Sequence, residues 1–80
     1  MQPHNRQRLE KYRRQYNAWV NDRVLYDLDG AAKNEIIDVI RQEWNPGYTT
    51  DLWCGSCVAK MLEYAFRSMD TEVVKIKMND

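Results

Sequence analysis

Apolar residues in the first quarter of the chain recur mostly at intervals of three and four positions. This spacing places them on one stripe of an amphipathic helix, and the basic residues of the segment fall mainly off that stripe. Asn5 has a side chain that suits the N-cap position of a helix. The pattern predicts a helix over residues 5–23, whose apolar stripe consists of Leu9, Tyr12, Tyr16, Trp19 and Val20.

Two more helices follow from the same periodicity. Asp29 is a favourable N-cap for a second helix over residues 30–44, and Asn45-Pro46-Gly47 ends it, because proline disfavours a helical residue before it and glycine accepts turn dihedrals. A third helix is predicted over residues 52–69. The apolar faces consist of Ala32, Ile36, Ile37, Val39, Ile40 and Trp44 in the second helix, and of Leu52, Val58, Ala59, Met61, Leu62, Ala65, Phe66 and Met69 in the third.

The last segment changes period. Val74, Ile76 and Met78 alternate with lysines, which is the pattern of a β-strand over residues 72–78. A lone strand leaves backbone groups unpaired, so it needs residues 24–28, a second copy or another protein beside it, or it stays extended. We therefore expect a mainly α fold with one domain over residues 1–80, namely a small three-helix bundle with a short C-terminal β-strand or extended tail.

Charge is balanced in total but uneven along the chain. Twelve Lys and Arg match twelve Asp and Glu, so the formal net charge is zero. Residues 1–23 hold six basic and two acidic residues, whereas residues 24–44 hold five acidic and two basic residues. The two segments are expected to attract each other, either within one molecule or between copies.

Size and hydropathy narrow the class of protein. Hydrophobic residues make up 44% of 80 residues, which allows a thin core that a partner would enlarge. The N-terminus lacks the apolar run of a signal peptide, and no segment approaches the roughly 18 apolar residues of a membrane helix. We expect a cytoplasmic protein with reduced thiols and no membrane partner.

The most specific local feature is Trp53-Cys54-Gly55-Ser56-Cys57 at the start of the third predicted helix. A thiol at a helix N-terminus faces unpaired N–H groups that favour its thiolate, and the spacing of three puts both sulfurs on one face. The motif resembles WCGPC of the thioredoxin family, and this resemblance implies Cys54 as the attacking thiol and Cys57 as the resolving one.

The context of the motif differs from that family. A polar segment and not a buried strand precedes it, serine replaces the usual proline, and only eleven residues follow Met69, too few for the remaining strands and helix. Homology to thioredoxins is therefore not inferred, and a thiol–disulfide redox protein stays an alternative. The interpretation we favour is that Cys54 and Cys57 are small buried residues in a tightly packed helix start, with Trp53 beside them in the core.

A structural zinc site is a second alternative for the same cysteines. Such sites take four ligands, and besides Cys54 and Cys57 the chain offers His4, Asp51 or a second copy. We expect no metal and no other cofactor. An enzyme is also not expected, because there is one histidine, no visible pairing of it with a nucleophile and no glycine-rich phosphate loop.

Nucleic-acid binding is a third alternative. The basic residues of the first helix can contact phosphates, and its aromatic residues can stack on bases if they are exposed. The zero net charge and a third helix that begins without base-reading Arg, Asn or Gln favour a solvated basic face instead. The candidate contacts are Arg6, Arg8, Lys11, Arg13 and Arg14.

Residues 44–66, which include Asp51-Leu-Trp-Cys-Gly-Ser-Cys-Val58, resemble small proteins of tailed phages and prophages of gut bacteria. The resemblance brings no assigned activity, but it implies an accessory or virion-associated protein in the host cytoplasm or the virion. We expect a non-enzymatic module that binds another protein or a second copy of itself, because Trp and Tyr are numerous and are enriched at interfaces. The expected partner-binding residues are Tyr12, Arg13, Tyr16, Val74 and Ile76.

Overall fold

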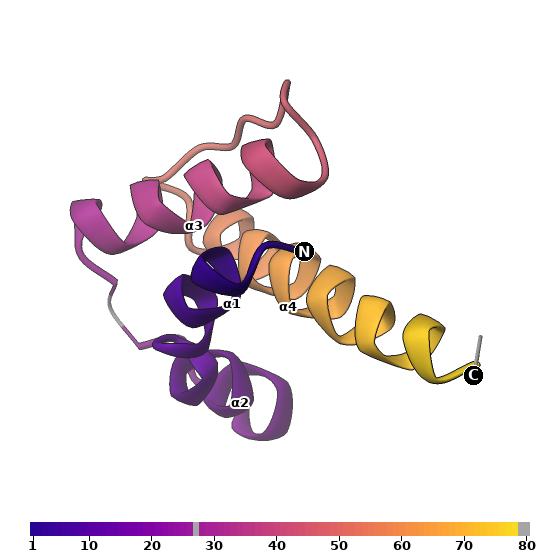
Figure 1. Cartoon of the computed structure of the whole chain (residues 1–80). Helices are drawn as coiled ribbons and strands as arrows, with labels where there is room; N and C mark the ends of the chain where they lie inside the picture. Colours follow the sequence, from indigo (N-terminus) through magenta and orange to yellow (C-terminus); the bar gives the residue numbers. More distant parts are fainter. Residues whose placement is uncertain (27, 79–80) are drawn as a thin grey trace.

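The computed structural model describes residues 1–26 and 28–78, with side chains in 1–26 and 28–71, and this part of the chain forms four helices (Figure 1). They are α1 (Pro3–Glu10), α2 (Arg13–Asp22), α3 (Gly30–Glu43) and α4 (Gly55–Met78). The described ranges contain no β-strand. The prediction of a mainly α fold is confirmed, whereas the three-helix bundle and the C-terminal strand are wrong.

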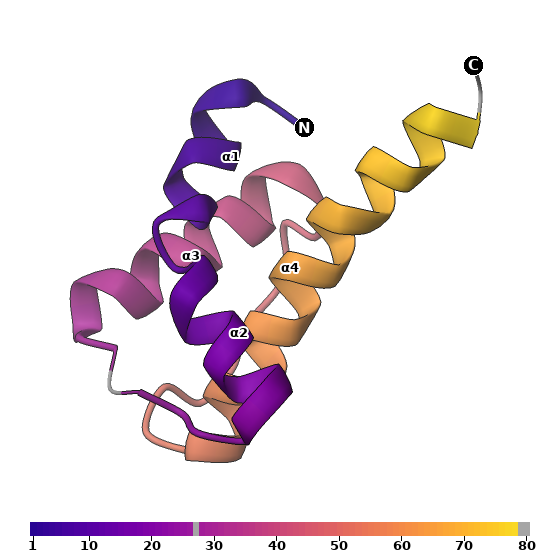
Figure 2. The ribbon, with the colours of Figure 1, turned by 90° about the horizontal axis from the view of Figure 1, so that it is seen from below.

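The single helix predicted over residues 5–23 is two helices. Tyr12 has φ −105° and ψ 10°, outside the helical range, and its N–H donates to the Leu9 carbonyl at 2.8 Å, which ends α1 in a tight turn. The bend allows α1 to pack on α3 and α4 while α2 packs on α4, as Figure 2 shows. The apolar stripe runs on through the bend, so periodicity alone does not reveal it.

The start of α1 also differs from the prediction. The helix begins at Pro3, a residue whose fixed φ suits the first turn, and Gln2 occupies the cap position. Asn5 therefore lies inside the first turn and is not the N-cap. Its side chain is 1% exposed and points toward α3.

The second predicted helix corresponds to α3 almost residue for residue. The carboxylate of Asp29 accepts a hydrogen bond of 2.7 Å from the Ala32 N–H, which is the expected N-cap. The helix ends at Glu43, just before the turn at residues 45–47. Local signals suffice here because both ends are determined by side chains adjacent in sequence.

Helix α4 is longer than predicted at one end and shorter at the other. Its start is delayed to Gly55 because the Asp51 carboxylate accepts from the Trp53 N–H at 2.9 Å and holds residues 51–54 in a turn. At the other end, the backbone of residues 72–78 continues α4 in place of the predicted strand. Extending an existing helix satisfies each new N–H locally, whereas a strand needs a neighbouring strand.

The core lies where α3 and α4 cross, with Leu9 of α1 closing one side. Completely buried side chains contribute roughly 1.5–3 kcal/mol each through loss of apolar surface from water. None of the helices in the described ranges combines the length and hydropathy that a membrane crossing needs. The largest side chains with no more than marginal exposure are Phe66, Leu9, Ile36, Ile40, Met61, Leu62, Met69 and Val39.

Candidate functional site

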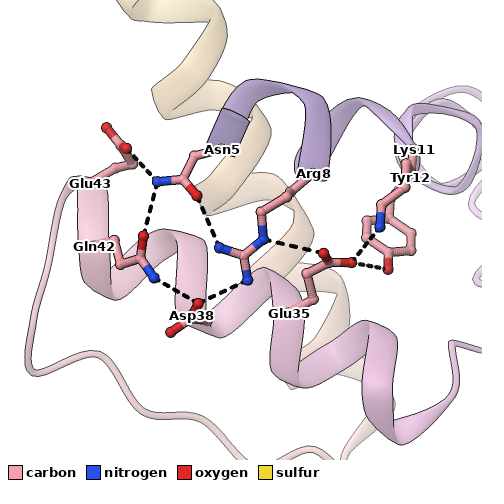
Figure 3. Close-up of polar contacts among 8 residues, drawn as sticks. All are labelled: Asn5, Arg8, Lys11, Tyr12, Glu35, Asp38, Gln42 and Glu43. Carbon is pink, nitrogen blue, oxygen red and sulfur yellow. Dashed lines mark hydrogen bonds and ion pairs between the residues drawn. The ribbon is translucent and has the colours of Figure 1, made fainter. Parts of the chain in front are cut away.

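A chain of polar contacts joins α1 and the following turn to α3 (Figure 3). Its centre is Glu35, whose carboxylate accepts from the Tyr12 hydroxyl at 2.6 Å and from Arg8 Nε at 3.2 Å, and lies 2.8 Å from Lys11 Nζ. Lys11 and then Tyr12 make the largest contributions that lower the pKa of Glu35 to about 2. Burial, and next the hydrogen bond to Glu35, raise the pKa of Tyr12 to about 12.

The network continues toward the N-terminus through the buried Asn5 side chain. Its amide nitrogen donates to Glu43 at 2.6 Å and to Gln42 at 3.1 Å, and its oxygen accepts from Arg8 at 2.9 Å. Arg8 also donates to Asp38 at 2.8 Å. Every polar group of Asn5 that burial removes from water thus has a partner on α1 or α3, so this cluster holds the two helices together.

Three of the five candidate nucleic-acid contacts are neutralised within the molecule. Arg8 and Lys11 pair with α3 carboxylates, as the charge asymmetry of the sequence predicts for attraction inside one molecule, and Arg13 pairs with Glu10 at 2.8 Å. In the described part of the chain, Arg6 and Arg14 have no ion pair. Of these five basic side chains, two are therefore left without an ion pair in the described part of the chain.

The three expected partner-binding residues of the N-terminal half also have partners in this fold. The Tyr16 ring stacks on the buried Phe66 ring with centroids 4.7 Å apart, and the Arg13 guanidinium lies 4.8 Å from the Phe66 centroid. Arg13 also forms a two-pronged pair with Asp70 at 3.0 and 3.1 Å. Tyr12, Arg13 and Tyr16 thus dock α2 on α4 and the turn on α3.

The side chains of Val74 and Ile76, the expected partner-binding residues of the tail, lie outside the described residues. Their backbone belongs to the last turns of α4, which extend away from the other helices in Figures 1 and 2. The predicted role of these two side chains stays a prediction.

Among the described side chains, the most exposed large hydrophobic one lies at the opposite end of α4. Trp53 is 95% exposed, and Tyr26 beside it is 54% exposed. Lys33 Nζ lies 5.9 Å from the Trp53 ring centroid and donates to the Leu52 carbonyl at 3.0 Å. A cavity of about 190 Å³ opens here, and we call it the Trp53 pocket; it is lined by Leu25, Tyr26, Leu28, Lys33, Leu52, Trp53, Gly55 and Val58.

Sequence reasoning missed this surface because it assigned Trp53 to the core next to the cysteines. The signal that indicates otherwise is the Asp51 side chain, which favours a turn two residues on and so keeps Trp53 out of the helix. Tyr26 follows α2 in a segment that is neither helix nor strand. Hydrophobic periodicity therefore does not indicate which way its side chain faces.

The two cysteines flank the first turn of α4. Cys54 occupies the cap position, and its sulfur accepts from the Cys57 N–H at 3.4 Å and lies 3.2 Å from Ser56 Oγ. The Cys57 thiol and then the Ser56 hydroxyl lower the pKa of Cys54 to about 7, and the Cys54 side chain raises the pKa of Cys57. Both thiols are free and half-buried, so the expectation that they are buried packing residues is wrong.

A closed zinc site is not preformed in the described residues. Nowhere in them do three His, Cys, Asp or Glu side chains gather in a way that suits a metal ion. His4 is exposed on α1 and Cys54 and Cys57 supply two ligands, whereas structural zinc takes four.

The structure therefore contains a polar junction between α1 and α3, in which the side chains hydrogen-bond to one another. It also contains an exposed aromatic pocket beside a pair of free thiols. No protein-family model matches the chain, and no curated protein or solved structure is significantly similar to it.

Proposed function

We propose that this protein is a small non-enzymatic binding module that docks a partner protein through the Trp53 pocket. The observation that carries the proposal is the 95% exposure of Trp53 beside a cavity that is lined mostly by residues with apolar side chains. A tryptophan and a tyrosine at the rim of a pocket are the side chains that most often dominate the energy of protein interfaces. In an isolated molecule, this apolar surface remains in contact with water.

The position of the pocket supports docking without refolding. Its walls come from the connection between α2 and α3, the first turn of α3, the turn before α4 and the start of α4, and several of these residues pack on the core. Lys33 is fixed by its bond to the Leu52 carbonyl and adds a positive charge at the rim. A partner segment with an apolar anchor for the pocket and a polar or acidic edge for Lys33 fits this surface.

Two further points favour binding over catalysis. The titratable side chains of the polar network bond to one another and join α1 to α3. Their pairing is therefore explained by its contribution to holding the two helices together. The resemblance of residues 44–66 to small tailed-phage proteins supports an accessory or virion-associated role. The partner is another protein, and a second copy bound through the same pocket is the alternative occupant.

The proposal is tested by photo-crosslinking from the pocket. A photoreactive aromatic residue, which keeps a ring at the docking position, replaces Trp53 in one full-length variant. In a matched control, the same residue replaces the exposed Arg67, whose side chain is 71% accessible. We expect one dominant adduct from position 53 and none from position 67, after irradiation in the native host cells. A dimer of the chain identifies self-association, and an adduct with a second protein identifies the partner.

A substitution complements the crosslink. Trp53→Ala should remove partner capture but change the free energy of unfolding by less than about 0.5 kcal/mol, because an exposed side chain contributes little to folding. Full capture by this variant, or equal adducts from both crosslinking positions, would contradict docking at the pocket.

A further inference from the structure

We propose that Cys54 and Cys57 form a reversible thiol–disulfide site, in which Cys54 attacks a disulfide substrate and Cys57 resolves the mixed disulfide. The substrate class is a small or peptide disulfide that reaches the first turn of α4. This inference does not depend on the binding function of the Trp53 pocket, since it concerns the sulfur atoms and the N–H groups around them.

The geometry gives the two thiols different surroundings. Cys54 lies at the cap of a 24-residue helix, where its sulfur accepts from the Cys57 N–H at 3.4 Å and is 3.2 Å from Ser56 Oγ. Unpaired N–H groups and the helix dipole favour negative charge at this position. Cys57 lies inside the first turn and not at the cap position, so Cys54 is the thiol that ionises first.

The pair is also close enough to react internally. The two residues are three positions apart at a helix start, where side chains share a face, and the Cys54 sulfur lies 3.4 Å from the Cys57 backbone nitrogen. Helical neighbours at this spacing have Cβ atoms about 5–6 Å apart and a disulfide needs about 3.5–4.5 Å, so closing the bond requires the first turn to tighten. Because both side chains are half-buried and not enclosed, a substrate has access to them.

The directions of the two pKa shifts agree with this order of ionisation. The pKa of Cys54 is lowered to about 7, near the pH at which an attacking thiol is most effective. The pKa of Cys57 is raised, first by the Cys54 side chain and then by burial; Asp51 adds to this shift and Lys60 opposes it. From α3, Lys33 brings a charged group to this end of the molecule, and its Nζ lies 5.9 Å from the ring centroid of the adjacent Trp53.

The chemistry balances as two exchanges. The Cys54 thiolate attacks one sulfur of the substrate R–S–S–R, forms a Cys54–S–R bond and releases RS⁻. Cys57 loses its proton to solvent and attacks the Cys54 sulfur, which forms the Cys54–Cys57 bond and releases the second RS⁻. Two electrons pass from the protein dithiol to the substrate disulfide, and an excess of a small thiol reverses both steps.

The experiment uses the full chain and glutathione disulfide, with products followed by mass spectrometry between pH 5 and pH 9. Wild type should lose two hydrogens with no retained glutathione, whereas Cys57→Ser should keep one glutathione on Cys54. Cys54→Ser should react at least tenfold more slowly at pH 7 than Cys57→Ser. The rate at which iodoacetamide alkylates Cys54 in wild type should be half-maximal near pH 7, against about 8.5 for an ordinary thiol.

A labelling measurement covers the case in which a serine variant does not fold. With a limiting amount of iodoacetamide at pH 7, wild type should be alkylated mainly at Cys54, and urea should remove this preference by melting the helix. Equal alkylation of both cysteines in the folded protein, or equal rates for the two serine variants, would overturn the proposal. Trp53→Ala should retain the thiol reaction, which separates this site from partner docking.

Discussion

The Tyr12 hydroxyl donates a hydrogen bond of 2.6 Å to a carboxylate oxygen of Glu35, across 23 positions of sequence. Tyr12 is the residue at which the chain bends between α1 and α2, and Glu35 lies in the middle of α3. The bond ties the bend to the helix that supports it (Figure 3). Glu35 thereby connects the basic N-terminal segment to the acidic middle segment in a partly buried setting.

Stability should fall in acid through Glu35. Its pKa is about 2 in the folded protein and about 4.3 in an unfolded chain, so the stabilisation is complete above the unfolded value and is lost as pH falls from about 4.5 to 2. Allowing for screening by solvent, we expect a loss on the order of 1–2 kcal/mol. Urea unfolding at pH 6, 4, 3 and 2 measures it.

Glu35→Gln provides the control for this pH dependence. The variant should be less stable than wild type at pH 6 and should approach wild type as the pH nears 2, because the titrating group is gone. An unchanged slope of stability against pH in the variant would assign the acid sensitivity to other carboxylates.

Replacing Arg23 with glycine should stabilise the protein. Arg23 ends α2 in the left-handed region, with φ 56° and ψ 31°, where a side chain costs free energy that glycine does not. The side chain has compensating contacts, since its guanidinium lies 5.4 Å from the Trp19 ring centroid and 3.9 Å from Glu63. We expect a net gain of about 0.5 kcal/mol in the free energy of unfolding for Arg23→Gly.

Arg23→Ala separates the backbone from the side-chain contribution. It loses the same contacts but keeps a Cβ, so it should be less stable than Arg23→Gly by about 1 kcal/mol. Equal stabilities of the two variants, measured by urea unfolding, would show that the left-handed conformation is not maintained in solution.

Deletion of residues 71–80 should shorten α4 but leave the fold. The truncation keeps Met69 in the core and Asp70 in its pair with Arg13, and it removes about two helical turns. Far-UV circular dichroism should lose signal in proportion, and the free energy of unfolding should change by less than about 1 kcal/mol.

The same deletion tests the predicted role of Val74 and Ile76. If docking occurs through the Trp53 pocket, the truncated protein should give the same photo-adduct from position 53 as the full chain. Loss of that adduct with an intact helical signal would assign partner binding to the tail instead.

The sequence by itself determined the features that depend on neighbouring residues. The Asp29 cap, the buried face of α3 at Ile36 and Ile40, and the stop at Pro46 and Gly47 all follow from local propensity and periodicity. The cysteine pair at a helix start was visible for the same reason. Even so, its sulfurs were expected in the interior, because burial depends on what else packs against the turn.

Tertiary structure decided the bend at Tyr12, the pairing of Arg8 with Glu35 and the exposure of Trp53. These features arise when segments far apart in sequence meet, and a repeat of 3.6 residues is the same on a straight helix as on a bent one. Whether an aromatic or a charged side chain is free for a partner depends on which surface lies opposite it. That surface exists only after the helices have packed.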